Sequence, residues 1–299
     1  MKKKLLAALA VLPLVALLAG CSGGAADASG SAASGDDKVV KIGVVGASDP
    51  YWAVYTKAAA AEGIKVEVVD FAVFEQPNPA LSAGELDLNQ FQHIVYLADY
   101  NVSSKQDLVP IGATAIYPLG LYSTKHKKVS EIKKGDTIAV PNDASNLARA
   151  LLVLQSAKLV TLKDGGTIFS TLDDIDTGKS KVTVTALEAS LTATSLPDVD
   201  GAVINNDFVE KAGLKFSDAL AQDDPADPNS LPYVNVFAAR AEDKDNPTYQ
   251  KLVKIYQTTK AVQDGVLEVS GGSAELVQTP VADLVSSLAK VEKDTKAQK

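Results

Sequence analysis

The sequence predicts an α/β protein with two lobes, each built around a mainly parallel sheet. The first observation is that β-rich runs alternate with helical segments, and that this pattern starts at residues 39–45 and restarts at residues 137–140. Alternation of this kind produces parallel strands joined by right-handed crossovers. The second observation is length, because about 260 residues follow residue 38, which suits two lobes of a little over 100 residues each.

In the first lobe the strand over 39–45 is followed by Asp49, which can cap a helix, and by Pro50, which suits a first helical turn. This predicts a helix over 51–61 that stops at Gly63. The remaining elements follow from the same signals: a strand at 65–71, a helix starting at 79–82, a short strand at 86–88, a helix at 92–100, and two strand-like runs within 108–122 broken near Pro118.

The second lobe is predicted to contain strands at 137–140, 182–187 and 201–204, and a helix at 146–157. A loop at 223–232 leads to a strand at 233–239, a helix at 247–264 and a C-terminal helical stretch at 280–291. We expect the chain to cross between lobes twice, near 118–122 and near 233–240. Lobe one would then comprise residues 39–120 and 236–299, and lobe two residues 121–235.

The N-terminus reads as a targeting segment rather than part of the fold. Lys2, Lys3 and Lys4 precede an apolar stretch over 5–19, which is short for a spanning helix and interrupted by Pro13. The small residues before Cys21, the only cysteine, resemble the bacterial lipobox. The resemblance implies cleavage of a signal peptide over 1–20 and attachment of acyl chains such as palmitate to Cys21, which would anchor the protein stably to a membrane. A plain secretory signal with an incidental cysteine is the alternative, and residues 21–38 are predicted to form the lipidated terminus and a flexible linker.

Candidate binding residues follow the predicted strands, because open parallel sheets bind ligands beyond the carboxyl ends of their strands. Arg149 falls in the first turn of its predicted helix, where a cation is disfavoured unless an anion is shared, and a guanidinium beside free backbone N–H groups suits a carboxylate. Asn205 and Glu188 can accept hydrogen bonds from a ligand ammonium. An apolar, polarisable pocket that suits a thioether can form from Phe91, His93, Tyr96 and Tyr117. Pairing of Arg149 with Asp143, helix capping and ordinary packing are the alternatives.

Composition and motifs argue against other functional classes. The net charge of −8, with both signs interspersed, argues against nucleic acid as a partner. His93 and His126 are the only histidines, and neither has a His or Cys partner at metal spacing. Phosphate-loop, serine acyl-transferase and calcium-loop signatures are all incomplete. No metal, cofactor or catalytic residue is therefore expected.

Together these residues resemble the methionine-binding lipoproteins of the NlpA family, the substrate-binding components of methionine import ABC transporters. The similarity covers about residues 39–272. Its most specific pieces are Asn89-Gln90-Phe91-Gln92-His93 with Tyr96, Tyr117-Pro118 with Gly120 and Tyr122-Ser123, Val140-Pro141-Asn142-Asp143 with Asn146, Leu147 and Arg149, Leu187-Glu188-Ala189, and Ala202-Val203-Ile204-Asn205.

The resemblance implies a periplasmic-binding-protein-like fold of class II, whose lobes close on free L-methionine. It implies that Arg149 takes the carboxylate, that Asn205 and Glu188 take the ammonium, and that the aromatic set encloses the side chain, with Asn142 and Asn146 completing the binding residues. Family members commonly carry Pro-His after the first strand, whereas this chain has Pro50, Tyr51 and Trp52, so Tyr51 and Trp52 are possible pocket-wall residues. The chain also continues beyond Gly271 and Gly272, where family members tend to end.

The expected function is capture of L-methionine at the extracytoplasmic face of the cell membrane and its delivery to an ABC permease with its ATPase. The membrane would be reached through lipid on Cys21, and no chemistry would be done on the ligand. The alternatives are binding of D-methionine, another related amino acid or a short peptide, and a surface adhesin. An extracytoplasmic enzyme would need a nucleophile or metal that the sequence does not offer.

Overall fold

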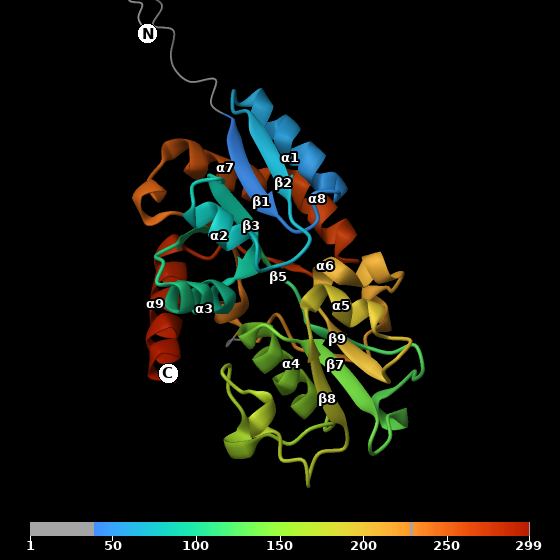
Figure 1. The fold of residues 1–299 in the computed structure, drawn as a ribbon. Coiled ribbons are helices and arrows are strands. Elements are labelled where there is room, and N and C mark those ends of the chain that lie inside the picture. Colours follow the sequence, from blue (N-terminus) through green and yellow to red (C-terminus); the bar gives the residue numbers. More distant parts are fainter. Residues whose placement is uncertain (1–38, 228–229, 299) are drawn as a thin grey trace, which may run out of the picture. The chain divides into compact units, whose positions relative to one another are not determined.

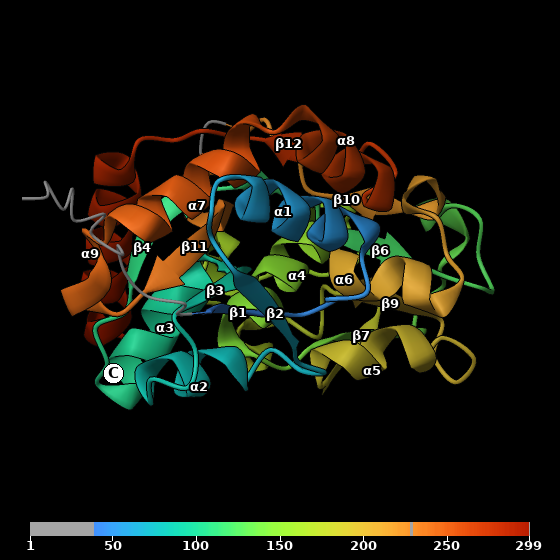
Figure 2. The same cartoon turned by 90° about the horizontal axis from the view of Figure 1, so that it is seen from above.

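The structure is a computed structural model that describes residues 39–227 and 230–298. These residues belong to one compact unit. The predicted signal peptide, Cys21 and the linker lie outside the described residues. The described chain is an α/β fold with two five-stranded sheets and a short two-stranded sheet (Figures 1 and 2).

The first sheet has the strand order β2-β1-β3-β11-β4. Its strands β1, β2 and β3 are parallel, while β11 is antiparallel to both of its neighbours and lies between β3 and β4. Strand β11 comes late in the chain, so it completes this sheet after the chain has built the second one. The bounds are β1 Val40–Val44, β2 Val66–Asp70, β3 Leu88–His93, β4 Val109–Ala113 and β11 Asn235–Ala239.

The second sheet has the order β10-β6-β9-β7-β8. Strands β7, β8 and β9 are parallel, and β6 joins them antiparallel to β9. The chain thus passes from the first sheet to the second between β4 and β6 and returns between β10 and β11, which confirms the two predicted crossovers. The bounds are β6 Gly120–Tyr122, β7 Thr137–Pro141, β8 Thr183–Leu187, β9 Gly201–Ile204 and β10 Ala221–Gln222, while β5 Ala115–Ile116 and β12 Glu275–Leu276 form the two-stranded sheet.

The helices lie on both faces of the sheets. Their bounds are α1 Pro50–Ala61, α2 Pro77–Ser82, α3 Ile94–Ser104, α4 Ala144–Ser156, α5 Ala189–Thr194, α6 Asn206–Val209, α7 Pro247–Thr258, α8 Lys260–Val269 and α9 Val281–Ala297. Short 3₁₀ turns lie at Val129–Glu131, Lys163–Gly165, Leu172–Asp174, Glu210–Ala212, Phe216–Asp218, Leu231–Tyr233 and Ala241–Asp243.

Four apolar clusters hold these layers together. Buried side chains of α1, α7 and α8 pack on one face of the first sheet, and those of α2, α3 and α9 pack on the other. Buried side chains of α4 cover one face of the second sheet. The fourth cluster joins the lobes, because it combines Phe74 and Phe91 of the first with Phe208 of the second, and the rings of Phe74 and Phe208 are 5.3 Å apart.

Most predicted elements are confirmed, but the one around residues 86–100 is wrong in its bounds. The strand extends through Asn89 to His93, and α3 begins at Ile94, so Asn89 and Phe91 lie within the sheet rather than after it. The sequence did not predict this part of the strand because it contains amide side chains, whereas a strand buried on both faces normally has an apolar sequence. Their burial is tolerated because Asn89 and Gln92 each hydrogen-bond Asn78.

Three further helix predictions change. The helix predicted at 247–264 is two helices, since Thr259 has extended backbone angles between α7 and α8. Helix α4 begins at Ala144, not at Asn146, because Asp143 caps it by accepting a hydrogen bond from the backbone N–H of Asn146. The C-terminal helix is longer than predicted and ends at Ala297.

The residue bounds proposed for the two lobes stay a prediction. Among the described residues, no helix combines the length and the apolar character that crossing a membrane requires.

Candidate ligand-binding site

An inner cavity of about 20 Å³ lies where loops and strand ends of the two lobes meet. Strand β3 and the start of α3 provide one wall, and the first turns of α4 and α6 provide another. Its lining residues are Phe74, Phe91, Gln92, His93, Tyr96, Tyr117, Asn146, Arg149, Asn205, Asn206, Asp207 and Asn235. Seven of the nine predicted ligand-binding residues therefore come together here. The free space is smaller than an amino acid, so a ligand needs the walls to move apart.

Arg149 is the cation of this cavity, and it is held in place from three sides. Its Nε donates to Oδ2 of Asp223 at 2.6 Å, and Nη2 donates to the backbone carbonyl of Tyr117 at 2.8 Å. The guanidinium also lies over the ring of Tyr233, 4.3 Å from its centroid. Nη1 makes no hydrogen bond to the described residues, so the group keeps one donor nitrogen for an anion.

The sequence prediction for Arg149 needs two corrections. The earlier start of α4 puts Arg149 in the second helical turn rather than the first, so the macrodipole argument does not apply. The carboxylate that pairs with it is Asp223, not Asp143, whose oxygens cap the helix instead. Arg149 is buried and forms one ion pair, with Asp223, so its guanidinium still suits a ligand carboxylate.

A chain of polar side chains leads from His93 to Asn205. Nδ1 of His93 accepts from the backbone N–H of Tyr96, so Nε2 carries the proton and donates to Oδ1 of Asn146 at 3.3 Å. Burial, with the nearby charge of Arg149, lowers the pKa of His93 to about 3, so the ring is neutral. The same Oδ1 accepts from Nδ2 of Asn205 at 3.0 Å.

This chain leaves one acceptor without a partner. Oδ1 of Asn205 is buried and accepts no hydrogen bond, although the residue is only 7% exposed. A buried unsatisfied oxygen costs roughly 1–3 kcal/mol, and in a cavity it points to a ligand that donates. Oδ1 of Asn205 is therefore able to accept a hydrogen bond from a donor group of a ligand.

The remaining wall of the inner cavity is aromatic. The rings of Phe74, Phe91 and Tyr96 are 5.7 to 6.2 Å apart, in tilted and edge-to-face arrangements. His93 lies against Tyr96 and Tyr233. Such a wall favours an apolar, polarisable side chain, including a thioether.

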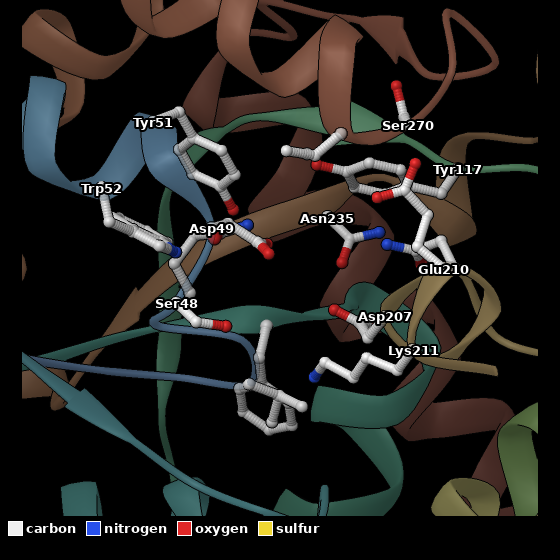
Figure 3. Close-up of a pocket in the computed structure, with 15 residues that line it drawn as sticks. Ser48, Asp49, Tyr51, Trp52, Tyr117, Asp207, Glu210, Lys211, Asn235 and Ser270 are labelled. Carbon is white, nitrogen blue, oxygen red and sulfur yellow. The ribbon is translucent and has the colours of Figure 1, made fainter. Parts of the chain in front are cut away.

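An outer cavity of about 270 Å³ adjoins the inner one (Figure 3). The two share Phe91, Tyr117, Asn206, Asp207 and Asn235. In Figure 3, Ser48, Asp49 and Tyr51 face Asp207, Glu210 and Lys211 across the space, with Asn235 between them. The outer cavity is thus a polar continuation of the inner one.

Two carboxyl groups in the outer cavity are strongly perturbed. Burial raises the pKa of Asp207 to about 7, with Lys211 opposing the shift and Asp49 adding to it. Burial also raises the pKa of Asp49 to about 6, against the effect of Lys211. Near neutral pH, Asp207 is therefore close to half-ionised, whereas Asp49 is mostly ionised.

Tyr51 and Trp52 line the outer cavity and also pack in the core of the first lobe. The ring of Trp52 lies 4.9 Å from Tyr51, 5.6 Å from Tyr55 and 6.0 Å from Tyr256. The two residues thus border the outer cavity and pack in the core, and their pocket-wall role stays a prediction. Trp52 is 2% exposed, and its Nε1 donates to nothing in the described residues.

Asn142 and Glu188 do not line either cavity. Asn142 borders a separate cavity together with Ser145 and Phe169. The carboxylate of Glu188 caps α5, accepting from the backbone N–H of Ser190 at 3.1 Å and from its hydroxyl.

The lining or supporting residues that escaped the sequence analysis include Phe74, Asp207, Asp223 and Asn235. Asn235 left a signal, because it is the one amide within an otherwise apolar strand. Asp207 also left one, since it is a polar residue two positions after Asn205, just beyond β9. Phe74 and Asp223 lie in loops where nothing in the pattern distinguished them.

One group outside the cavities has the composition of a metal site. Ligand atoms of His126, Asp136 and Asp200 lie within 4.8 Å of one another. Asp200, however, already accepts from the backbone N–H of Thr137 and from the Lys125 ammonium, so the group is explained by protein contacts.

Comparison with known proteins identifies related lipoproteins and a related binding protein of known structure. The profile described as NlpA lipoprotein matches residues 40–275. "Outer membrane lipoprotein 1" of Mannheimia haemolytica is 42% identical over 75% of this chain and 81% of that protein. A "probable D-methionine-binding lipoprotein" of Haemophilus influenzae is 36% identical over 88% of this chain and 95% of its own length. A solved nutrient-binding protein of Burkholderia cenocepacia, described as bound to methionine, is 37% identical and covers 79% of this chain and 99% of that one, with a TM-score of 0.73.

Proposed function

The chain belongs to the NlpA lipoprotein family, and we propose that it is the substrate-binding lipoprotein of an ABC importer that captures L-methionine and delivers it to a permease with its ATPase. The protein would act by binding, with no bond made or broken in the ligand. The observation that carries this proposal is the pairing, in one cavity, of a buried guanidinium with a buried amide oxygen that lacks a donor.

The cavity offers a partner for each part of an α-amino acid. The Arg149 guanidinium would bind the carboxylate, and Oδ1 of Asn205 would accept from the ammonium. Asn235 lines the same space, and its side-chain amide makes no hydrogen bond to the described residues, so it can bind the same ammonium or the carboxylate. The thioether would lie among Phe74, Phe91 and Tyr96.

Binding would be coupled to movement of the lobes. Arg149 on α4 and Asn205 just after β9 lie with the second sheet, whereas Asn235, the first residue of β11, and the aromatic rings of Phe91 and Tyr96 lie with the first sheet. A ligand that contacts both favours the closed arrangement by the difference in its affinity for the two states. The inner cavity of about 20 Å³ is consistent with a closed arrangement that a ligand enters after opening.

We propose that the protein acts at the extracytoplasmic face of the cell membrane, anchored by acyl chains on Cys21. Two or more chains give stable anchoring, at about 0.8 kcal/mol per buried methylene. D-methionine and other relatives of methionine remain the alternative ligands, and a surface adhesin is the alternative function.

Calorimetric titration of the detergent-solubilised full chain, stripped of retained ligand, tests the proposal. We expect L-methionine to bind, and Arg149→Ala and Asn205→Ala each to weaken binding at least about 100-fold, since an unpaired buried charge costs roughly 3–5 kcal/mol. Asn142→Ala is the matched control for Asn205→Ala, because its side chain borders a different cavity. Wild-type affinity in the Arg149 and Asn205 variants would rule out this site.

A further inference from the structure

The segment just before β7 is strongly basic, although the chain as a whole is acidic. The net charge is −8, yet residues 125–134 contain five lysines and a single carboxylate. We call residues 125–134 the basic turn. A local excess of positive charge of this kind creates an attractive potential for anions beside the second lobe. The lysines of the basic turn are Lys125, Lys127, Lys128, Lys133 and Lys134.

The charges of the basic turn are exposed and largely unneutralised. All five lysine side chains are exposed. Among the described residues, only Lys125 of this set forms an ion pair, with its Nζ 3.2 Å from Oδ1 of Asp200. The one carboxylate within the turn, that of Glu131, accepts from the backbone N–H of Lys127 at 2.7 Å. Four ammonium groups are therefore available to a partner outside the fold.

Backbone contacts hold the basic turn in one shape. Ile132 is 1% exposed and packs in the apolar cluster between α4 and the second sheet. The backbone N–H of Lys133 donates to Oδ2 of Asp136 at 2.7 Å. The backbone N–H of Gly135 donates to the carbonyl of Lys181 at 2.9 Å. The lysines are thus carried by a fixed backbone, which lowers the entropy cost of binding a partner.

A recess of about 280 Å³ adjoins the basic turn. Lys134 and Lys181 border it, together with the hydroxyl-bearing residues Thr177 and Thr183. Leu172 lines the same recess and is 37% exposed. This surface therefore combines cations, hydroxyl groups and an exposed apolar side chain.

The basic turn and the recess lie away from the ligand cavity. Strands β7 and β8 are parallel, and the carboxyl end of β7 at Pro141 leads to Asn146 of the inner cavity. The basic turn precedes the amino end of β7, and Lys181 precedes that of β8, so both lie at the opposite edge of the second sheet (Figure 1). A partner bound at this edge would leave the ligand cavity free.

We propose that the basic turn and its recess dock on the anionic phospholipid headgroups of the membrane that holds the chain. This inference rests on the proposed lipid anchor at Cys21. Lysine is a compact, strongly hydrated cation, which suits the diffuse field of many phosphates. Protein interfaces instead favour arginine and aromatic side chains, and residues 123–136 contain no Arg, Phe, Tyr or Trp.

The proposed contact is within reach of the anchor. Residues 21–38 span at most roughly 60 Å when fully extended, whereas a compact chain of the described length is about 50 Å across. The chain from the anchor enters the fold at the amino end of β1, so the anchor holds the first lobe. The basic turn would add a contact through the second lobe, and the body would then lie along the bilayer.

Lysine footprinting of the full lipidated chain tests the proposal. The protein is reconstituted in vesicles of phosphatidylcholine, either alone or with about 30% phosphatidylglycerol, acetylated briefly and analysed by mass spectrometry. We expect the lysines of the basic turn to react at least about threefold more slowly on the anionic vesicles in 0.1 M salt. This protection should largely disappear in 1 M salt, because the Debye length falls from about 10 Å to about 3 Å.

Two exposed lysines of the first lobe serve as internal controls. Lys57 on α1 and Lys105 at the end of α3 belong to helices that pack on opposite faces of the first sheet. A flat bilayer can cover at most one of these faces. At least one of the two lysines should therefore react equally on both kinds of vesicle.

A variant of the basic turn assigns the protection to its charges. Lys125 and Lys181 report on the contact, and both should lose their protection when the four lysines without an ion pair are changed together, by Lys127→Gln, Lys128→Gln, Lys133→Gln and Lys134→Gln. The matched control should keep the protection, since it changes four exposed lysines of the first lobe to Gln: Lys41, Lys57, Lys105 and Lys254. Surface substitutions of this kind rarely disturb folding.

Three outcomes would overturn the inference. They are equal reactivity of the basic turn on both kinds of vesicle, protection of Lys125 and Lys181 that persists in the basic-turn variant, and protection that appears only when the permease is present, which would assign the surface to a protein partner.

The same experiments separate this inference from the proposed function. A chain that washes off phosphatidylcholine vesicles would remove the proposed anchor together with this inference. A chain that stays on them but shows no protection on anionic vesicles would remove the inference alone. L-methionine binding, measured by calorimetry, should be equal in the wild type and the basic-turn variant, because the turn lies away from the ligand cavity.

Discussion

At the scale of single residues, Asp223 decides how Arg149 can bind an anion. Its Oδ2 fixes the Nε of Arg149, and its Oδ1 accepts from the backbone N–H of Leu119 at 2.8 Å. The guanidinium is thereby tied to the segment that connects the two sheets. Asp223 is a positioning residue, since it does not line the inner cavity.

Asp223→Asn should weaken methionine binding roughly tenfold, because an amide nitrogen facing Nε removes a charge-assisted hydrogen bond. Calorimetry measures the affinity, and Asp224→Asn, an exposed neighbour whose Oδ1 caps Ala226, is the control. If Asp223 acts by positioning Arg149, then in an Arg149→Lys background the Asp223→Asn change should have less effect on the affinity for methionine than it has with arginine at position 149. Equal affinity of the Asp223→Asn variant and the wild type would exclude the role.

Asp207 should make stability depend on pH. Its pKa of about 7 in the folded state lies above the ordinary aspartate value of 3.8, so the folded state binds more protons between these values. Stability is therefore lost as pH rises from about 4 to 7 and levels off above that. Asp207→Asn should be more stable than the wild type at pH 8, by roughly 2–4 kcal/mol at 1.36 kcal/mol per pKa unit, and nearly equal at pH 4.

Denaturant unfolding of ligand-free protein at pH 4, 6 and 8 measures this difference. Glu85→Gln serves as the control for loss of one exposed carboxylate. A constant difference between Asp207→Asn and the wild type across this range would show that Asp207 titrates normally.

At the scale of elements, the residues beyond Gly272 form β12 and α9 and complete the core of the first lobe. The segment first forms β12, which pairs with β5, and then α9, which packs across α3 (Figure 1). Leu284, Leu288 and Val291 are buried against the first sheet and α3. Nδ2 of Asn101 donates to Glu292 at 2.8 Å. This extension is part of the first lobe's core and not a separate appendage.

Leu288→Ala should destabilise the protein by about 2–5 kcal/mol, because truncating a buried leucine leaves a cavity. Val285→Ala on the opposite face, where Val285 is 42% exposed, should change stability by less than about 0.5 kcal/mol. Chemical denaturation compares the two. If both substitutions cost the same, α9 is not packed as described.

At the scale of the whole molecule, the proposed membrane attachment rests on Cys21. Cys21→Ala should leave a soluble or uncleaved precursor, because acyl chains are the only anchor that the sequence offers. Membrane fractionation and lipid labelling measure the outcome, with Ser22→Ala as the control. Unchanged lipid labelling of the Cys21→Ala protein would remove the lipoprotein assignment.

The sequence alone determined the alternation of elements, both crossovers and most of the predicted residues that line the inner cavity, because local signals carry them. Periodicity and caps mark strands and helices, and polar residues beyond strand ends mark a ligand edge. Arg149, Asn205 and His93 were found in this way. Local signals failed where a long-range contact satisfies a side chain: Asn89 and Gln92 look unsuited to a buried strand until Asn78 pairs with them.

Only the tertiary structure decided which of these residues share a cavity and which acid pairs with Arg149. Asp223 and Asn235 lie more than 70 residues from Arg149 in sequence, and no local pattern joins them to it. It also turned Glu188 into a helix cap and Asn142 toward another cavity, although both follow strands as the predicted rule requires. Strand ends fix where a side chain starts, but packing between the lobes fixes where its polar atoms point.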